Sequence, residues 1–154
     1  MVELISVHIP KTAGTAFQKT LLHVYGSEQV LLDYPPDRVY RPGEPIADSI
    51  KVIHGHFALK KYRNHFPEAY RIVWLRHPVF RLISEYFYAL TIHDTKNVAH
   101  AELFEKNLDI VGFAKLPSMQ NHMQRWLQEI ELEDLYFVGL QEFYPQDIDD
   151  LKSL

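Results

Sequence analysis

The chain has 154 residues, and its 16 Lys and Arg against 20 Asp and Glu give a formal net charge of −4, which argues against broad nucleic-acid binding. It has no cysteine, which excludes disulfides, thiolate metal sites and a cysteine nucleophile. A chain of this length buries about 70% of its unfolded surface, enough for one core, so we treat residues 1–154 as a single domain. No apolar run approaches the length of a membrane span, about 20 residues, and the first residues do not resemble a signal peptide, so we expect a cytoplasmic protein with no membrane span.

Five apolar runs predict strands, and segments with helical periodicity lie between them. The strands are rich in β-branched and aromatic residues; they are Leu4–Ile9, Ile50–His54, Tyr70–Leu75 and Leu135–Leu140, with a weaker run at Gln29–Leu32. The predicted helices cover Thr15–Tyr25, Ala58–His65, Val79–Leu90 and Ser118–Gln128. Because parallel strands need crossover connections, this alternation predicts an α/β fold, a P-loop-like parallel sheet with helices on both faces.

Two stretches match neither pattern. Asp33–Ser49 contains four prolines and a glycine, so we expect a long Pro-rich loop over 33–49, which is either a lid or binding loop or a disordered segment. Thr91–His100 follows a predicted helix, and we interpret it as a second mobile surface.

The first strand runs into Pro10-Lys11-Thr12-Ala13-Gly14-Thr15, a short segment that opens a helix. Ligands of open parallel sheets bind beyond the carboxyl ends of the strands. Small residues allow successive backbone N–H groups to face one anion, and Lys11 with the hydroxyls of Thr12 and Thr15 adds further donors. Lys11 precedes the glycine, so the segment differs from a Walker A loop. The alternative is an ordinary strand-to-helix turn with an exposed lysine.

The strand Tyr70–Leu75 ends in Arg76-His77-Pro78 and leads into a helix that carries Arg81 and Ser84 on one face. Arginine suits bidentate phosphate binding. Arg76 therefore leaves the sheet at its ligand-binding edge, whereas Arg81 is either a second phosphate ligand or one half of a surface ion pair with Glu85.

The second strong strand ends in His54-Gly55-His56, where two-residue spacing puts both imidazoles on one side of an extended chain. A metal site would need further ligands, and the other histidines do not have the spacing of a zinc motif. Two alternatives remain, a structural pair bonded to the backbone and a proton acceptor beside the anion loop.

Taken together, these segments resemble the PAPS-dependent sulfotransferase family, in particular its carbohydrate and heparan-sulfate 2-O-sulfotransferase branch. Pro10 to Thr15 resembles the family's 5′-phosphosulfate loop, and Leu75 to Tyr86 resembles its 3′-phosphate motif. A His-Gly-His segment lies between the two motifs in that branch, and Phe137 to Phe143 resembles a late strand and turn.

The resemblance implies 3′-phosphoadenylyl sulfate (PAPS) as donor and adenosine 3′,5′-bisphosphate (PAP) as product, with no metal required. The N–H groups of Lys11 to Thr15 would hold the 5′-phosphate, and Lys11 would stabilise the charge that develops on the bridging oxygen. Arg76 and Ser84 would bind the 3′-phosphate. His56 would accept the acceptor proton, with His54 as its orienting partner or as a second candidate base.

Three departures from the family pattern stand out. His77 occupies a position where the family usually has Asp, and Ala13 and Ala16 replace a commoner Gly and Ser. Family members also continue past the Phe137 segment, whereas here a helix that begins at Pro145 ends with the chain, so we expect a domain that is short at its C-terminal end.

The acceptor is expected to be a hydroxyl compound, in particular a carbohydrate. One group of residues in the Pro-rich loop and one after the second strong strand could hold an anionic glycan, although the second group could equally be a solvated charged face. They are Arg38, Tyr40 and Arg41, and Lys60, Lys61 and Arg63. The alternatives to a sulfotransferase are a non-catalytic nucleotide-binding module and a P-loop kinase or nucleotide hydrolase.

Overall fold

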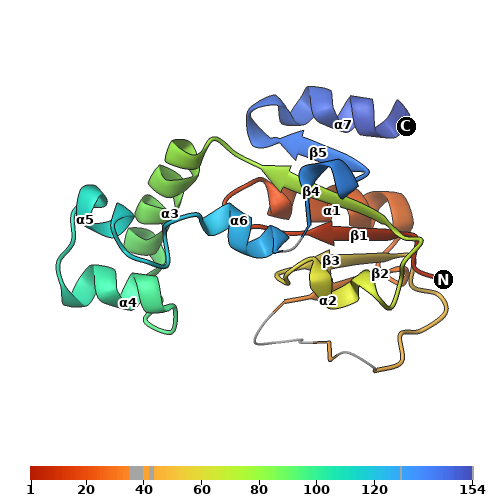
Figure 1. Cartoon of the computed structure of the whole chain (residues 1–154), viewed down its shortest axis with the longest axis horizontal. Coiled ribbons are helices and arrows are strands. Elements are labelled where there is room, and N and C mark those ends of the chain that lie inside the picture. The colour runs from red at the N-terminus through yellow and green to blue at the C-terminus, as the bar shows by residue number, and fades with distance from the viewer. Residues whose placement is uncertain (35–39, 42–43, 129, 154) are drawn as a thin grey trace. The chain divides into compact units, whose positions relative to one another are not determined.

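A computed structural model describes residues 1–34, 40–41, 44–128 and 130–153 (Figure 1). The chain forms two compact units, where the sequence suggested one domain. Unit 1 combines Met1–Leu75 with Met123–Leu154, and unit 2 is Arg76–His122. Each unit is described by itself.

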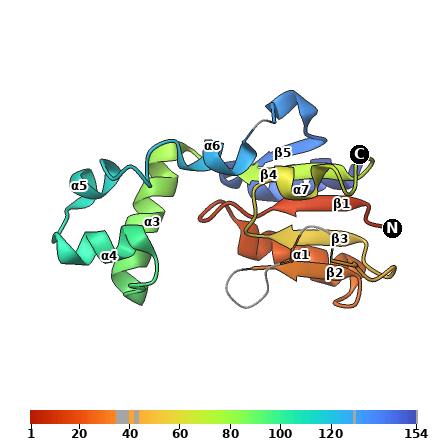
Figure 2. The same ribbon diagram turned by 60° about the horizontal axis from the view of Figure 1, so that its bottom comes forward.

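Unit 1 is built on a five-stranded parallel sheet with the strand order β2-β3-β1-β4-β5 (Figure 2). The strands are β1 (Leu4–Val7), β2 (Val30–Asp33), β3 (Val52–Gly55), β4 (Tyr70–Leu75) and β5 (Phe137–Leu140). All five predicted strands are therefore confirmed. The boundaries of β4 agree at both ends, and the others differ by one or two residues.

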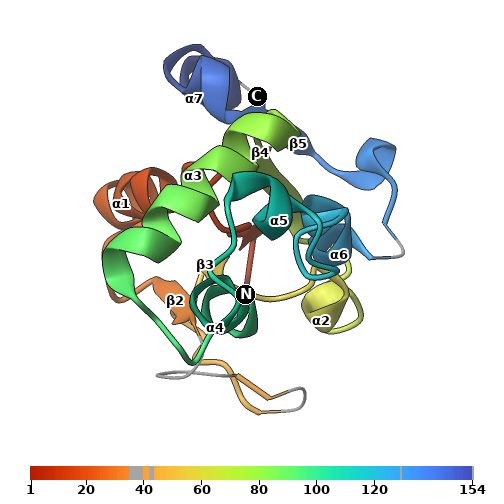
Figure 3. The ribbon, with the colours of Figure 1, turned by 90° about the vertical axis from the view of Figure 1, so that its left-hand side faces the viewer.

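Helices cover both faces of the sheet, as predicted (Figure 3). They are α1 (Gly14–Tyr25), α2 (Lys60–Arg63), α6 (His122–Leu127) and α7 (Tyr144–Ser153), with short 3-10 turns at Leu132–Asp134 and Gln141–Phe143. Alternate strand residues point to opposite faces, so Ile5 and Ile53 join the core that includes α2 and α6, whereas Val52 and Trp74 join the core beneath α1 and α7. Full burial of such an apolar side chain contributes about 1.5–3 kcal/mol.

Unit 2 consists of α3 (Pro78–Ile92), α4 (Val98–Glu105) and α5 (Ile110–Ala114), which share a small apolar core. The sequence patterns predicted α3 but neither α4 nor α5. Both missed helices carry N-cap signals that could have revealed them: the Asn97 side chain accepts from the N–H groups of Ala99 and His100, and Asp109 accepts from Gly112. The stretch 91–100 is therefore the end of α3, a turn and the beginning of α4.

The connections of the sheet create the place where a ligand is expected to bind. From β1 the chain continues to β2, which lies beyond β3, and from β3 it continues to β4, which lies beyond β1. The connections that follow the neighbouring strands β1 and β3 therefore run in opposite directions along the sheet. Open α/β sheets bind ligands outside the carboxyl ends of two such strands. The residues after Val7 and after Gly55 consequently lie at this edge.

The Pro-rich stretch 33–49 contains no helix or strand at its described positions after Asp33, which itself ends β2. Residues 35–39, including the candidate Arg38, and residues 42–43 lie outside the described part of the chain. Within the described residues, we find no helix long and apolar enough to cross a membrane.

Candidate functional site

The loop between β1 and α1 has the backbone geometry of an anion site. Lys11 and Ala13 have φ angles of 70° and 73°, in the left-handed region, and Thr12 between them does not. Alternation of this kind turns successive N–H groups into one concave surface. Ala13 is the N-cap of α1 and has no side chain that could accept from the first turn. The loop therefore presents backbone donors and the positive end of a helix dipole, which fit a phosphate group.

Gly14 begins α1 because no side chain fits there. An added Cβ would lie 1.8 Å from Cδ2 and 2.2 Å from Nε2 of His8. The imidazole of His8 thus occupies the space that a side chain at position 14 would need. The glycine permits this close approach of the imidazole, and the role expected from sequence, a backbone N–H that faces an anion, stays a prediction.

The two threonines of the loop differ in their roles. The Thr12 hydroxyl donates to the backbone oxygen of Ile9 at 2.8 Å and is fully buried. Its only proton is used to close the loop, so this hydroxyl does not offer the donor that the sequence led us to expect, and the part of Thr12 that stays a predicted ligand contact is its backbone N–H. Thr15, in the first turn of α1, is exposed.

His54 lies inside the sheet and faces α1. It pairs with Ser6 across the β1 and β3 ladder, and its Nδ1 is 2.9 Å from the Ser6 hydroxyl. The side chain is fully buried, its ring packs edge-on against Phe17, and burial lowers its pKa to about 4. His54 is therefore neutral near pH 7 and has no direct access to solvent.

His56 follows β3 and is half-buried. Its Nδ1 donates to the backbone oxygen of His8 over 2.6 Å. A carbonyl can only accept, so Nδ1 carries the proton, and in the neutral ring the lone pair is on Nε2. This is the tautomer that a general base needs, with its orientation set by the strand beside it.

His8 and Tyr34 belong to the same cluster, and sequence reasoning did not select them. His8 follows β1, Tyr34 follows β2, and the His8 Nδ1 lies 2.7 Å from the Tyr34 hydroxyl. Burial lowers the pKa of His8 to about 3, with smaller contributions from electrostatic coupling to the His56 and His54 imidazoles and to Lys11, and burial raises the pKa of Tyr34. Both groups are neutral near pH 7. The sequence placed His8 inside the predicted strand Leu4–Ile9 and Tyr34 at the start of the Pro-rich stretch, so their positions at the strand ends gave no signal.

The rings of three neighbouring histidines, His8, His54 and His56, lie against one another. Among residues 1–34, 40–41, 44–128 and 130–153 there is no group of three or more His, Asp or Glu side chains arranged to hold a metal ion. The His8 ring instead contacts those of His54 and His56, with centroid separations of 5.5 and 4.4 Å.

In unit 2, the predicted phosphate ligands lie in different environments. Arg76 directly follows the end of β4, His77 is the N-cap of α3 and Ser84 is half-buried within that helix. Arg81 is only 2% exposed. Its guanidinium lies 3.5 Å from the Glu85 carboxylate and contacts the Met119 sulfur.

The pair of Arg81 and Glu85 is therefore buried, whereas sequence reasoning considered a surface pair. Glu85 also lies 2.9 Å from Nε2 of His100, which is itself buried. This polar cluster lies within the helices of unit 2, and a guanidinium so engaged is a poor candidate for direct phosphate binding.

Comparison with known proteins identifies the family. A sulfotransferase family model matches residues 2–143. The chain belongs to the sulfotransferase family. The solved structure of mouse sulfotransferase SULT7A1 complexed with PAP aligns with 98% of this chain and 56% of its own, with a TM-score of 0.51 and 17% identity, which supports the fold. This sulfotransferase chain thus spans 56% of the length of that mouse relative. A search of curated proteins gives no significant match.

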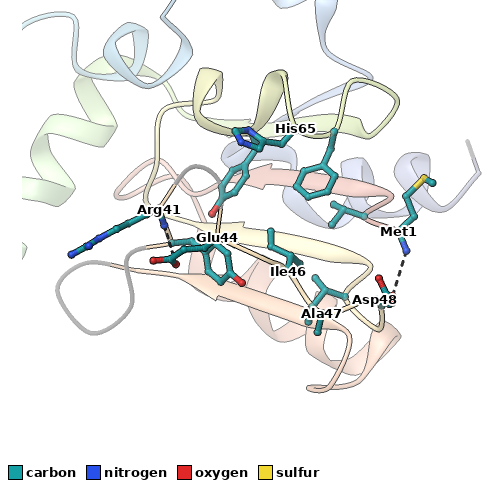
Figure 4. A pocket seen from close by; sticks show the side chains of 12 residues that line it. Met1, Arg41, Glu44, Ile46, Ala47, Asp48 and His65 are labelled. Carbon is teal, nitrogen blue, oxygen red and sulfur yellow. Dashed lines mark hydrogen bonds between the residues drawn. The ribbon is translucent and has the colours of Figure 1, made fainter.

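Unit 1 of this sulfotransferase family member also contains a pocket of about 320 Å³, between the described part of the Pro-rich stretch and the segment that includes α2 (Figure 4). Tyr40 and Arg41, both acceptor candidates from sequence, line it together with Tyr62, His65 and Phe66. Of the second group of candidates, Lys60 and Arg63 are exposed, and Lys61 forms an ion pair with the buried Asp33.

Proposed function

We propose that the protein transfers a sulfuryl group from PAPS to a hydroxyl of an acceptor. The observation that carries this proposal is the hydrogen bond from His56 Nδ1 to the backbone oxygen of His8. It orients the imidazole at the sheet edge that also holds the loop of Lys11 to Thr15, with the proton on Nδ1 and, in the neutral ring, the lone pair on Nε2. A proton acceptor beside an anion cradle is the combination that sulfuryl transfer requires.

The loop suits the 5′-phosphosulfate end of the donor. Its curved backbone and the first turn of α1 supply several N–H donors, and Lys11 adds a positive charge. When the acceptor oxygen bonds to sulfur, the bond between sulfur and the bridging oxygen breaks, and negative charge grows on the 5′-phosphate of PAP. Donors that are already oriented toward this charge lower the barrier, because they need no rearrangement during the reaction.

His56 completes the proton balance. The acceptor hydroxyl loses its proton to Nε2 of His56 as its oxygen attacks sulfur, so the products are the sulfate ester, PAP and a protonated imidazole that later releases the proton to water. His54 is fully buried and bonded to Ser6, which suits an orienting role rather than that of the base.

We propose that Arg76 and Ser84 bind the 3′-phosphate, as the family resemblance implies. Arg81 is instead proposed to hold α3 in place through its pair with Glu85, because its guanidinium is buried within unit 2. Charge-assisted hydrogen bonds from Arg76 would account for most of the affinity for this phosphate.

We also propose that the acceptor is a carbohydrate. The pocket that Tyr40, Tyr62 and Phe66 line offers aromatic side chains, which suit the face of a sugar ring, whereas the Arg41 guanidinium points away from the other lining residues (Figure 4). A P-loop kinase would need a carboxylate for magnesium. The strand next to the loop strand ends in His54-Gly55-His56, and the nearby Asp33 is already engaged by Lys61 and Tyr62.

Two measurements test the function. Titration calorimetry compares PAP with ATP plus magnesium, and we expect PAP to bind and ATP to bind more weakly or not at all. Transfer of labelled sulfate from PAPS is then followed to a panel of acidic glycans, neutral glycans and phenols. Preference for ATP would contradict a sulfotransferase, whereas PAP binding without transfer to any acceptor would support a nucleotide-binding module.

A further inference from the structure

The imidazole of His8 lies at the centre of the site, although the proposed chemistry assigns it no step. It is 8% exposed and contacts residues from three other segments. On one side its ring lies against those of His54 and His56, and on another its Nδ1 bonds to Tyr34. The Cδ2 and Nε2 edge covers Gly14 of the anion loop.

The backbone of His8 is held as firmly as its ring. Its N–H donates to the oxygen of Gly55 at 2.8 Å, and its own oxygen accepts from His56 Nδ1. The N–H of His56 in turn donates to the oxygen of Asp33 at 2.9 Å. These bonds extend the sheet one residue beyond β1 and β3, so neighbouring strands fix the backbone positions of the candidate base and of His8.

Tyr34 closes the cluster from the end of β2. Its ring stands nearly perpendicular to that of His56, at 85° with 4.7 Å between centroids, and also to that of His8, at 84° and 5.6 Å. The preceding residue, Asp33, accepts from the Tyr62 hydroxyl at 2.7 Å and from Lys61, so the strand that carries Tyr34 is fixed at its end.

We infer that Tyr34 and the His8 side chain are positioning residues: they hold the His56 ring in the rotation at which its Nδ1–H reaches the His8 backbone oxygen, and they couple this orientation to the anion loop; this role in transfer rests on the proposed function. The Tyr34 hydroxyl fixes the rotation of the His8 ring. That ring supports His56 on one face and covers Gly14 with its edge. Loss of the hydroxyl lets the His8 ring turn, which loosens the support of the base and the cover of the loop together.

The first readout is the tautomer of His56, measured by nitrogen-15 NMR of the imidazoles in the full chain without donor or acceptor. We expect the Nδ1–H form in the wild type. Tyr34→Phe keeps the aromatic contact with His56 and removes the hydrogen bond, so we expect a mixture of tautomers. Tyr34→Leu removes both the contact and the hydrogen bond, so we expect a larger fraction of His56 in the Nε2–H form.

The second readout is the division between kcat and KM. A small displacement of a reacting group slows a reaction by up to about 10²-fold. We therefore expect Tyr34→Phe to lower kcat about 10-fold and, because the loop loses part of its cover, to raise the KM for PAPS by a smaller factor. Tyr144→Phe is the matched control, because it removes a hydroxyl that bonds to Thr20 elsewhere in unit 1, and both readouts should stay as in the wild type.

A third variant covers the case in which the Tyr34 variants do not fold. His8→Asn can retain a hydrogen bond to Tyr34 but loses the ring over Gly14 and beside His56, so we expect both a tautomer shift and weaker PAP binding. Wild-type His56 spectra in the folded variants would overturn the inference. Since the spectra need no reaction, a tautomer shift without sulfate transfer would instead refute the proposed function alone.

Discussion

The Nδ1 of His56 donates to the backbone oxygen of His8 over 2.6 Å, across the ends of two neighbouring parallel strands. This bond links the strand that carries the candidate base to the strand that carries the anion loop. The strand pairing of β1 and β3 therefore keeps the backbones of the base and of the anion loop together, and the side chains around His8 set the rotation of the His56 ring.

The most direct prediction concerns the base itself. His56→Ala is expected to preserve PAP binding in calorimetry and to slow sulfate transfer from PAPS by about 10²–10⁴-fold, the usual contribution of a general base. His23→Ala, on the exposed side of α1, is the matched histidine control and should leave the rate unchanged. If His54→Ala slowed transfer this much and His56→Ala kept wild-type activity, His54 would be the base and His56 its orienting partner.

Gly14→Ala tests the contact between the loop and His8. The new methyl group would overlap the imidazole, so we expect the free energy of unfolding to fall by about 1–3 kcal/mol, the usual effect of overpacking, and PAP to bind more weakly. Urea unfolding and calorimetry measure the two effects. Gly112→Ala, where the nearest atom is 3.2 Å away on a Leu108 side chain, should change neither property much. Equal stability of the two variants would argue against the close packing at Gly14.

Asp33→Asn tests the anchor at the end of β2. Asp33 is 1% exposed and accepts from Lys61, Tyr62 and the N–H of Tyr40. Removal of one partner of a buried ion pair lowers stability by about 3–5 kcal/mol, and we expect the lower end because Lys61 can reach solvent.

The control for Asp33→Asn is Glu3→Gln. Glu3 forms an ion pair with Lys51 that is exposed to solvent, so its loss should lower stability by less than about 1 kcal/mol in the same urea titration. Similar losses in the two variants would mean that Asp33 contributes no more than a surface charge.

Sequence patterns were sufficient for the sheet and for the loop, because both depend on local chemistry. The apolar run Tyr70–Leu75 is bounded by polar residues and a proline, and the residues from Pro10 to Thr15 have a composition that suits close contact with an anion. The same patterns led to His54 and His56 as candidates, and their unequal burial then favours His56 as the base.

The contacts that organise the site could not be predicted, because each joins residues that only the fold brings together. Tyr34 and His8 are 26 residues apart, and Met119 lies 38 residues after Arg81. A tyrosine at the start of a Pro-rich stretch has many possible partners. An arginine one turn from a glutamate looks like a surface pair until the core of unit 2 is known.

Arg76→Ala tests the proposed 3′-phosphate ligand. A hydrogen bond to a charged group contributes about 1.5–3 kcal/mol, so PAP affinity should fall by about 10- to 150-fold. Arg71→Ala removes the same charge near the other end of β4, where the guanidinium donates to the backbone oxygens of Phe66 and Pro67. Arg71→Ala should leave PAP affinity unchanged. If calorimetry found the same loss of PAP affinity in both variants, Arg76 would not be the 3′-phosphate ligand.

The buried histidines predict how stability depends on pH. The pKa values of His8 and His54 fall from 6.5 in the unfolded chain to about 3 and about 4 in the fold. Between about pH 6.5 and 4 the unfolded chain therefore binds protons that the folded chain does not. The stabilisation is fully present above pH 6.5 and is lost as the pH falls, by up to about 1.4 kcal/mol per pH unit for each histidine.

Urea unfolding at several pH values between 8 and 4, followed by tryptophan fluorescence, measures this slope. Both tryptophans, Trp74 and Trp126, belong to unit 1, so the signal reports on the unit that holds the two histidines. His54→Asn removes one titrating group and should reduce the slope, whereas His23→Asn, at an exposed position, should not. Because carboxylates titrate equally in both variants, an unchanged slope in His54→Asn would mean that His54 is protonated in the fold as readily as in the unfolded chain.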